Sequence, residues 1–200
     1  NYIHSVVVEE VVVQASLLGQ TEDGISDPLH ILDGAEIADM ATTSLGETLD
    51  SLAGVTTADY GSAVGQPILR GLSGLRVKVL TNGLVNRDVA GIGADHKNEV
   101  DLFDIQQVEV VRGPSSLLYA NGASGGIVNL VDNSIATSDV EEMSFKLGFE
   151  TQSVNSGDSQ NFAYSDNVGG LNLYFSYSDS AFGNYCLLYT SPSPRDTEVS

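Results

Sequence analysis

A serine framed by glycines is the first place in this chain where bond chemistry could occur. Gly122-Ala-Ser124-Gly-Gly126 matches the G-x-S-x-G pattern, in which a nucleophilic serine stands on a sharp turn between a strand and a helix. Here the glycines lead instead into Ile127 and Val128, whose β-branched side chains favour a strand. No histidine stands in a pattern that pairs it with Ser124. The sequence therefore predicts that the chain is not a hydrolase. It also carries no phosphate-binding loop, CxxC pair, HExxH motif or EF-hand loop.

A polar loop rich in carboxylates offers metal-ligand chemistry. Residues 94–101 read Ala-Asp-His-Lys-Asn-Glu-Val-Asp, and a neighbouring carboxylate and imidazole suit Zn²⁺ or another borderline divalent cation. Asp95 and His96 alone cannot complete a tetrahedral site, so further ligands have to come from elsewhere. Lys97 follows directly, and its positive charge weakens cation binding unless the side chain points away. The alternative is a solvated loop whose histidine has no special role.

Two arginines stand beside glycines in apolar surroundings. Arg70 and Arg112 are two of only 8 basic residues in the chain. A guanidinium remains charged when buried and binds a carboxylate with two parallel hydrogen bonds. We expect these arginines to be buried and to pair with carboxylates. The alternative is that each is a surface arginine of a strand.

The charge of the chain is strongly acidic, with 27 acidic residues against 8 basic ones and a net charge of −19. Binding to nucleic acid or to an anionic lipid surface requires clustered Lys and Arg, so neither is an expected partner. The acidity is explained by solubility or by attraction of cations, and composition does not separate the two. The single cysteine, Cys186, excludes an internal disulfide.

Short strands and helices fill the first two thirds of the chain. Ser44 precedes Leu45, Leu49 and Leu52 at helical spacing, and Glu47 completes a capping box. Asn82-Gly83 predicts a tight hairpin turn. The other expected elements are a strand over 29–32, a turn and short helix over 33–40, strands over 66–72 and 76–80, a loop over 86–101, a short helix over 102–106, and then a strand.

From Met143 the pattern changes to longer and plainer alternation. Phe145, Leu147 and Phe149 share one face of a strand, and the residues between them, which are polar or glycine, share the other. The same alternation returns over 171–178, after a weaker strand over 160–166. Strands of this kind are typical of an outer-membrane barrel, with one face toward lipid and the other toward the lumen. The alternative is a soluble β-meander.

The segment Val108–Val131 contains Arg112-Gly113-Pro114, a short apolar stretch, a glycine cluster and a β-branched run. It resembles the signature segment of the plug domain of TonB-dependent outer-membrane receptors. The resemblance implies an α+β plug domain, a mixed small β-sheet with short helices, followed by the first antiparallel strands of a transmembrane β-barrel. It also implies a truncated fragment of a bacterial outer-membrane receptor, with Arg70-Gly71 and Asn82-Gly83 in the central plug sheet.

The same resemblance assigns roles to particular residues. The segment Glu9-Glu10-Val11-Val12-Val13-Gln14 resembles the TonB box, which pairs with TonB in the periplasm by strand addition. In the family, arginines at the places of Arg70 and Arg112 meet carboxylates of the barrel wall. The pair Asp95-His96 resembles the apical loop of zinc-uptake receptors, where such a pair contributes metal ligands.

We therefore expect a receptor that binds an extracellular nutrient and imports it, with a metal ion such as zinc as cargo and no resident cofactor. Its expected partners are TonB, outer-membrane lipid and the metal or metal chelate. The alternatives are a siderophore or haem receptor of the same family, and a periplasmic binding or signalling module built of the plug alone. The expected divisions are 1–24 for the TonB-box segment and linker, 25–137 for the plug, 138–185 for barrel strands, and 186–200 for a non-native tail that matches translated sequencing adapter.

Overall fold

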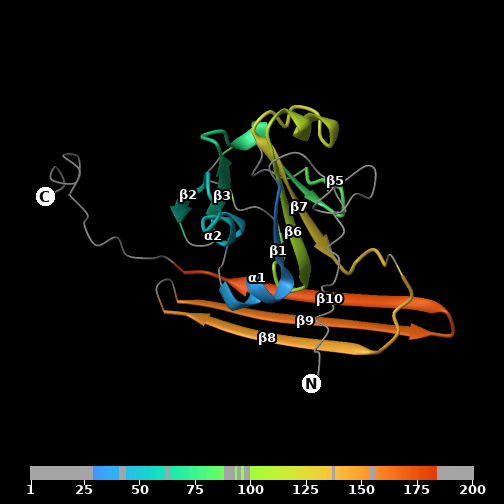
Figure 1. Cartoon of the computed structure of the whole chain (residues 1–200). Coiled ribbons are helices and arrows are strands. Elements are labelled where there is room, and N and C mark those ends of the chain that lie inside the picture. Colours follow the sequence, from blue (N-terminus) through green and yellow to red (C-terminus); the bar gives the residue numbers. More distant parts are fainter. Residues whose placement is uncertain are drawn as a thin grey trace, which may run out of the picture.

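The computed structural model describes residues 29–40, 44–61, 64–87, 93, 96, 100–136, 138–153 and 156–183. Two bodies of structure are evident in this part of the chain (Figure 1). One is a mixed-sheet domain formed by residues 29–132, and the other is a three-strand sheet formed by residues 144–181. The segment Glu9–Gln14, Asp95 and the tail 186–200 lie outside the described residues.

The mixed-sheet domain is built on five strands in the order β1-β6-β7-β4-β5. The strands β1 (Leu29–Asp33), β6 (Ile105–Arg112) and β7 (Gly126–Asp132) pair antiparallel. The strand β4 (Val77–Thr81) then runs parallel to β7, and the short β5 (Leu84–Val85) closes the edge. The β4–β5 turn is Asn82-Gly83, with positive φ at both residues, as the sequence predicts.

Two short helices and a hairpin cover one face of this sheet. These are α1 (Gly34–Met40), α2 (Leu45–Leu49), and the pair β2 (Val55–Gly61) and β3 (Val64–Leu69). The principal core lies between them and the sheet and includes Leu49, Leu69, Val108, Val110, Val128 and Leu130. On the opposite face, a smaller cluster that includes Val111, Ala120, Ala123 and Ile127 lies beside the short 3-10 helix Pro114–Leu118.

Local capping explains where both helices begin. The Ser44 hydroxyl accepts a hydrogen bond from the Glu47 backbone N–H at 3.2 Å, which confirms the predicted cap of α2. At α1 the Asp33 carboxylate accepts from the Glu36 N–H at 2.8 Å, and the Glu36 carboxylate accepts from the Asp33 N–H at 3.3 Å. The helix α2 is shorter than predicted, since it ends at Leu49 with Asp50 as its C-cap.

Two expectations are wrong. There is no helix over 102–106: the Asp101 carboxylate accepts a hydrogen bond from the Phe103 N–H at 2.9 Å, a turn follows, and β6 begins at Ile105. Ile105 pairs with Asp132 on β7, so the end of this stretch belongs to the sheet. Arg70-Gly71 does not lie in the central sheet either, because it follows β3, and among the described strands β3 pairs only with β2.

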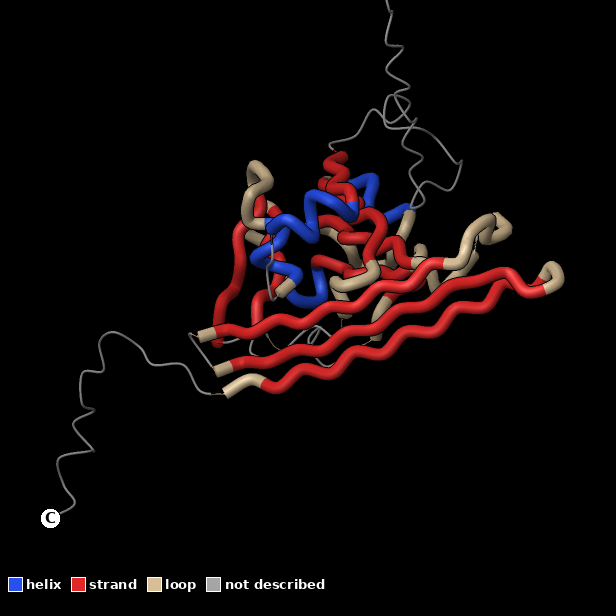
Figure 2. The backbone as a smooth tube through the Cα atoms, turned by 90° about the horizontal axis from the view of Figure 1, so that it is seen from below, coloured by secondary structure: helices blue, strands red, loops and turns tan. Residues whose placement is uncertain are grey.

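The three-strand sheet consists of β8 (Ser144–Gln152), β9 (Gly157–Val168) and β10 (Leu171–Ala181), paired antiparallel in that order. It runs along one side of the mixed-sheet domain (Figure 2). The predicted weak strand over 160–166 is part of β9, the longest of the three at 12 residues. None of the described helices has the length and apolar character needed to cross a membrane.

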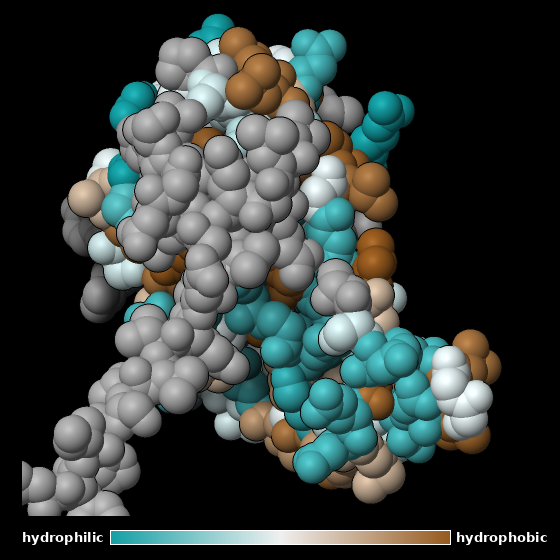
Figure 3. Space-filling view, turned by 45° about the vertical axis from the view of Figure 1, so that its right-hand side comes forward, coloured by the Kyte–Doolittle hydropathy of each residue, from teal (hydrophilic) through white to brown (hydrophobic). Residues whose placement is uncertain are grey.

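The two faces of the three-strand sheet differ in chemistry. The outer face carries exposed apolar side chains, among them Phe145, Phe149 and Phe175, and the exposed fraction of Phe149 reaches 75%. Phe162 contacts the rings of both Phe145 and Phe175, with centroids 5.2 and 5.7 Å apart. The inner face carries Ser, Asn, Gly and a few charged residues and lies toward the mixed-sheet domain. In Figure 3 hydrophilic side chains gather near the meeting of the two bodies.

Candidate functional site

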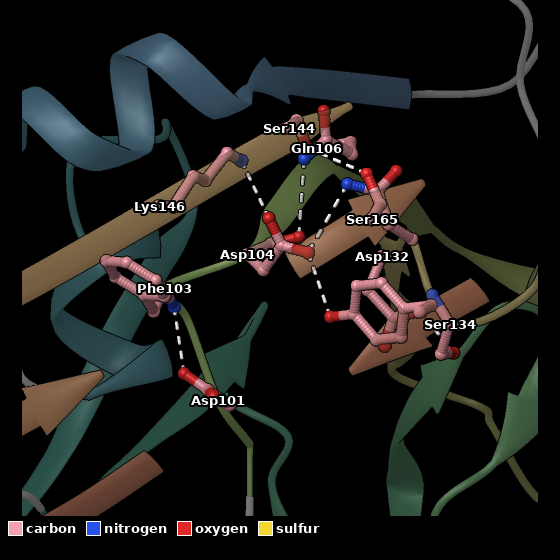
Figure 4. Close-up of polar contacts among 11 residues, drawn as sticks. Asp101, Phe103, Asp104, Gln106, Asp132, Ser134, Ser144, Lys146 and Ser165 are labelled. Atoms are coloured by element: carbon pink, nitrogen blue, oxygen red, sulfur yellow. Dashed lines mark hydrogen bonds and ion pairs between the residues drawn. The ribbon is translucent and has the colours of Figure 1, made fainter. Parts of the chain in front are cut away.

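The buried carboxylate of Asp104 joins the mixed-sheet domain to the three-strand sheet (Figure 4). Its Oδ1 accepts a hydrogen bond from Lys146 Nζ on β8 at 2.6 Å. Its Oδ2 accepts from the Tyr174 hydroxyl on β10 at 2.8 Å and from Asn133 Nδ2 at 3.3 Å. Only 6% of Asp104 is exposed, so these donors replace water around the charge. One side chain thus holds two strands that are not neighbours in their sheet.

The residue before it makes a matching apolar contact. Phe103 lies against the backbone of Gly148 on β8, where an added Cβ would stand 2.4 Å from the Phe103 ring. No side chain at position 148 fits without movement of that ring. Sequence reasoning missed both Phe103 and Asp104, and the only local signal was an acidic residue directly before an apolar strand.

Arg112 and Arg70 lie together at the ends of β6 and β3. Arg112 Nη1 donates to the Ala53 carbonyl and Nη2 donates to His30 Nε2, while Nε is buried without a partner. Burial and the neighbouring charge of Arg70 lower the pKa of Arg112. Arg70 is exposed, at a positive φ of 51°. No carboxylate of the described residues pairs with either arginine, so the predicted contact with barrel-wall carboxylates stays a prediction.

The predicted metal loop is described only at its anchor points. The side chain of Gln66, on β3, is 3% exposed, and its Nε2 donates to the carbonyls of Gly93 and His96 at 2.8 and 3.0 Å. His96 itself is exposed. Its neighbour Asp95 lies outside the described residues, so the structure does not test the pair. Within the described ranges, no three His, Cys, Asp or Glu side chains gather in a way that could hold a metal ion.

A second buried carboxylate, Glu109, lies in the middle of the mixed sheet and was also missed from the sequence. Gln107 Nε2 donates to its Oε1 at 2.8 Å, and Asn129 Nδ2 donates to its Oε2 at 2.9 Å. Asn129 Oδ1 in turn accepts from the Gly83 N–H at 2.8 Å, which ties the β4–β5 turn to β7. The signal for Glu109 was a charged residue inside an otherwise apolar strand.

The serine motif leads into β-structure, as predicted. Gly125 and Gly126 follow Ser124, and β7 begins at Gly126, so the helix that a nucleophile elbow requires is missing from this place. The Ser116 hydroxyl lies within hydrogen-bond distance of the carbonyls of Gly113 and Ala123, and its single O–H, shared between them, stabilises the turn. These glycines therefore shape a turn between strands.

Comparison with known proteins decides the family. The sequence model described as the TonB-dependent Receptor Plug Domain matches residues 22–127, which is more than half of the chain. The chain belongs to the TonB-dependent receptors. The mixed-sheet domain is therefore the plug, and β8, β9 and β10 are the first strands of the barrel. The family places the protein in the bacterial outer membrane. The four division boundaries expected from the sequence stay predictions.

Several relatives share this architecture. The vitamin B12 transporter BtuB of Vibrio vulnificus (strain YJ016) is 30% identical over 135 residues, which cover 65% of this chain and 22% of that protein. The ferric enterobactin receptor PfeA superposes with a TM-score of 0.61 at 17% identity, covering 78% of this chain and 25% of that one. The copper transporter OprC gives 0.57 at 17%, covering 76% and 23%. The chain thus spans about a quarter or less of each relative.

Proposed function

We propose that the full-length receptor binds an extracellular nutrient and imports it across the outer membrane, driven by TonB. The observation that carries this proposal is the packing of a plug against the polar inner face of alternating strands. A plug in this position blocks the lumen, so passage of cargo requires the plug to rearrange. The segment Glu9–Gln14, outside the described residues, is the proposed site of pairing with TonB.

The outer face of the three-strand sheet supports a membrane role over a soluble one. Its exposed aromatic and aliphatic side chains, such as Phe149, Leu147 and Leu173, suit contact with outer-membrane lipid. A periplasmic module built of the plug alone has no use for these strands. Catalysis is not part of the proposal, since the named relatives are transporters and receptors.

For the cargo we propose a metal ion, with zinc favoured. His96 is exposed, and Gln66 donates a hydrogen bond to its backbone carbonyl, so the imidazole is held beside β3. The net charge of −19 attracts cations to the receptor. The copper transporter OprC has the same fold, which is compatible with metal cargo. The remaining ligands would come from parts of the receptor beyond this chain.

A second candidate is a chelate or another organic cargo. The relative BtuB is a vitamin B12 transporter, and PfeA is a ferric enterobactin receptor. In this case Asp95 and His96 would be ordinary residues of the apical loop. A plug and barrel of this fold are compatible with either cargo, so binding measurements must distinguish a metal ion from an organic cargo.

Calorimetry on the full-length receptor in detergent tests the cargo. We expect Zn²⁺ to bind the wild-type receptor, and His96→Ala to weaken binding about 100-fold or more, because one of few metal ligands is lost. The matched control, His4→Ala, removes an imidazole from the N-terminal segment and should leave affinity unchanged. Equal zinc affinity in wild type and His96→Ala would exclude the metal site at this loop.

A further inference from the structure

The plug contacts the first barrel strands through a turn of two residues, Phe103 and Asp104. We propose that this turn is a clasp that keeps the plug seated in the closed receptor. Its socket consists of Lys146 and Gly148 on β8, Ala163 on β9, and Tyr174 on β10. The inference rests on membership of the receptor family and does not depend on which cargo is carried.

The polar half of the clasp is satisfied by donors from both bodies. Asp104 Oδ1 accepts a hydrogen bond from the Lys146 ammonium. Oδ2 accepts hydrogen bonds from the Tyr174 hydroxyl and from the side-chain amide of Asn133, which belongs to the plug. A carboxylate that is this deeply buried strongly requires such donors, because an unpaired charge away from water is costly. Loss of Lys146 or Tyr174 leaves the carboxylate with fewer donors and favours its release into water.

The apolar half of the clasp is a fit of shape. Gly148 leaves space for the Phe103 ring, and a side chain there would collide with two of its carbon atoms. Ala163 pairs with Lys146 in the sheet and is only 4% exposed, so a small side chain lies between the two strands that hold Asp104. Small residues at these two places let the turn approach the wall closely.

The clasp borders a cavity on the inner face of the strands. This cavity, of about 1070 Å³, is lined by Phe103 of the clasp and Lys146 of its socket and extends between α1 and the strands. Ile37 and Ala38 line it on the helix side, and Asn161, Ser178 and Glu150 line it on the strand side. Phe103 and Asp104 therefore contact the wall directly beside a space that separates α1 from the strands.

Conductance of the full-length receptor in planar lipid bilayers, without cargo or TonB, tests the clasp. We expect Lys146→Met and Asp104→Asn each to raise the time spent in conducting states roughly ten-fold, which corresponds to loss of one charged hydrogen bond whose donor, Lys146, is partly exposed. Gly148→Leu should raise it as well, because the added side chain displaces the Phe103 ring. The double variant Asp104→Asn/Lys146→Met should conduct no more than the stronger single variant, because both remove the same contact.

The matched control is Glu150→Gln, which removes a charge from the same face of β8. The Glu150 carboxylate accepts a hydrogen bond from the side chain of Gln152. It should conduct like the wild type. Heat-modifiable electrophoretic mobility confirms that each barrel is folded. Tyr174→Phe removes only a hydroxyl, so it provides the test if one of the larger substitutions prevents the receptor from assembling. Wild-type conductance in folded Lys146→Met and Tyr174→Phe receptors would overturn the proposal.

Discussion

At the scale of single residues, the plug depends on two buried carboxylates that are satisfied in different ways. Asp104 meets an ammonium and a hydroxyl of the barrel strands, and Glu109 meets amide groups of its own sheet. Each has its donors in place, which is the condition under which a carboxylate is tolerated inside a protein. The first joins two domains, and the second stabilises the inside of one.

Glu109→Gln should destabilise the plug although it hardly changes the size of the side chain. The new NH₂ group would face an amide donor of Gln107 or Asn129, so one hydrogen bond becomes a conflict of two donors. We expect a loss of about 1–3 kcal/mol in the local free energy of unfolding. Hydrogen exchange of the β6 and β7 amides in the full-length receptor measures it. The exposed control Glu142→Gln should change little, and equal protection in both variants would contradict this role.

At the scale of secondary-structure elements, β3 supports the loop that carries His96. Gln66→Met keeps the length of the side chain and removes both hydrogen bonds to the loop carbonyls. We expect the amide of His96 to exchange roughly 30-fold faster, since two hydrogen bonds worth about 1 kcal/mol each are lost. The control is Thr57→Val on the paired strand β2, because the Thr57 hydroxyl is buried without a partner. Unchanged exchange in Gln66→Met would show that other contacts hold the loop.

Elements whose cause is local could be predicted from the sequence. The cap at Ser44, the turn at Asn82-Gly83 and the alternation from Phe145 onward each depend on neighbours within a few residues, and each is confirmed. The expected helix over 102–106 is wrong because the Asp101 carboxylate holds a turn at Phe103 and because Ile105 pairs with distant Asp132 on β7. The Arg70-Gly71 turn was misplaced for the same reason, since local pattern does not say which sheet a strand joins.

The candidate site could not be predicted, because it is assembled over long distances in the chain. Asp104 is 42 residues from Lys146 and 70 from Tyr174. Nothing in the spacing of these residues brings them together; only the docking of the three-strand sheet on the plug does so. Asp95-His96 and Glu9–Gln14 were proposed from local resemblance, and both await tests in the complete receptor.

At the scale of the whole molecule, the proposed coupling to TonB has a clear test. Deleting Glu9–Gln14 from the full-length receptor should abolish nutrient uptake by cells and leave cargo binding unchanged, because the segment precedes the plug and is not part of the loop at His96. Uptake of radioactive zinc and binding to isolated outer membranes give the two measurements. A deletion of equal length, 17–22, is the control. Transport that survives the loss of Glu9–Gln14 would show that TonB engages another part of the chain.

The three-strand sheet has an unpaired edge strand on each side. Within the described structure β9 is paired on both flanks, whereas β8 and β10 are each paired on one flank only. Their outward backbone N–H and C=O groups can therefore join to any extended segment nearby, including one from another molecule. With Phe145, Phe149 and Phe175 exposed on the same sheet, such joining would also bury apolar surface. These three strands, produced without the rest of the barrel, would consequently be prone to form fibrils. Closure of the barrel pairs both edge strands and so prevents this aggregation.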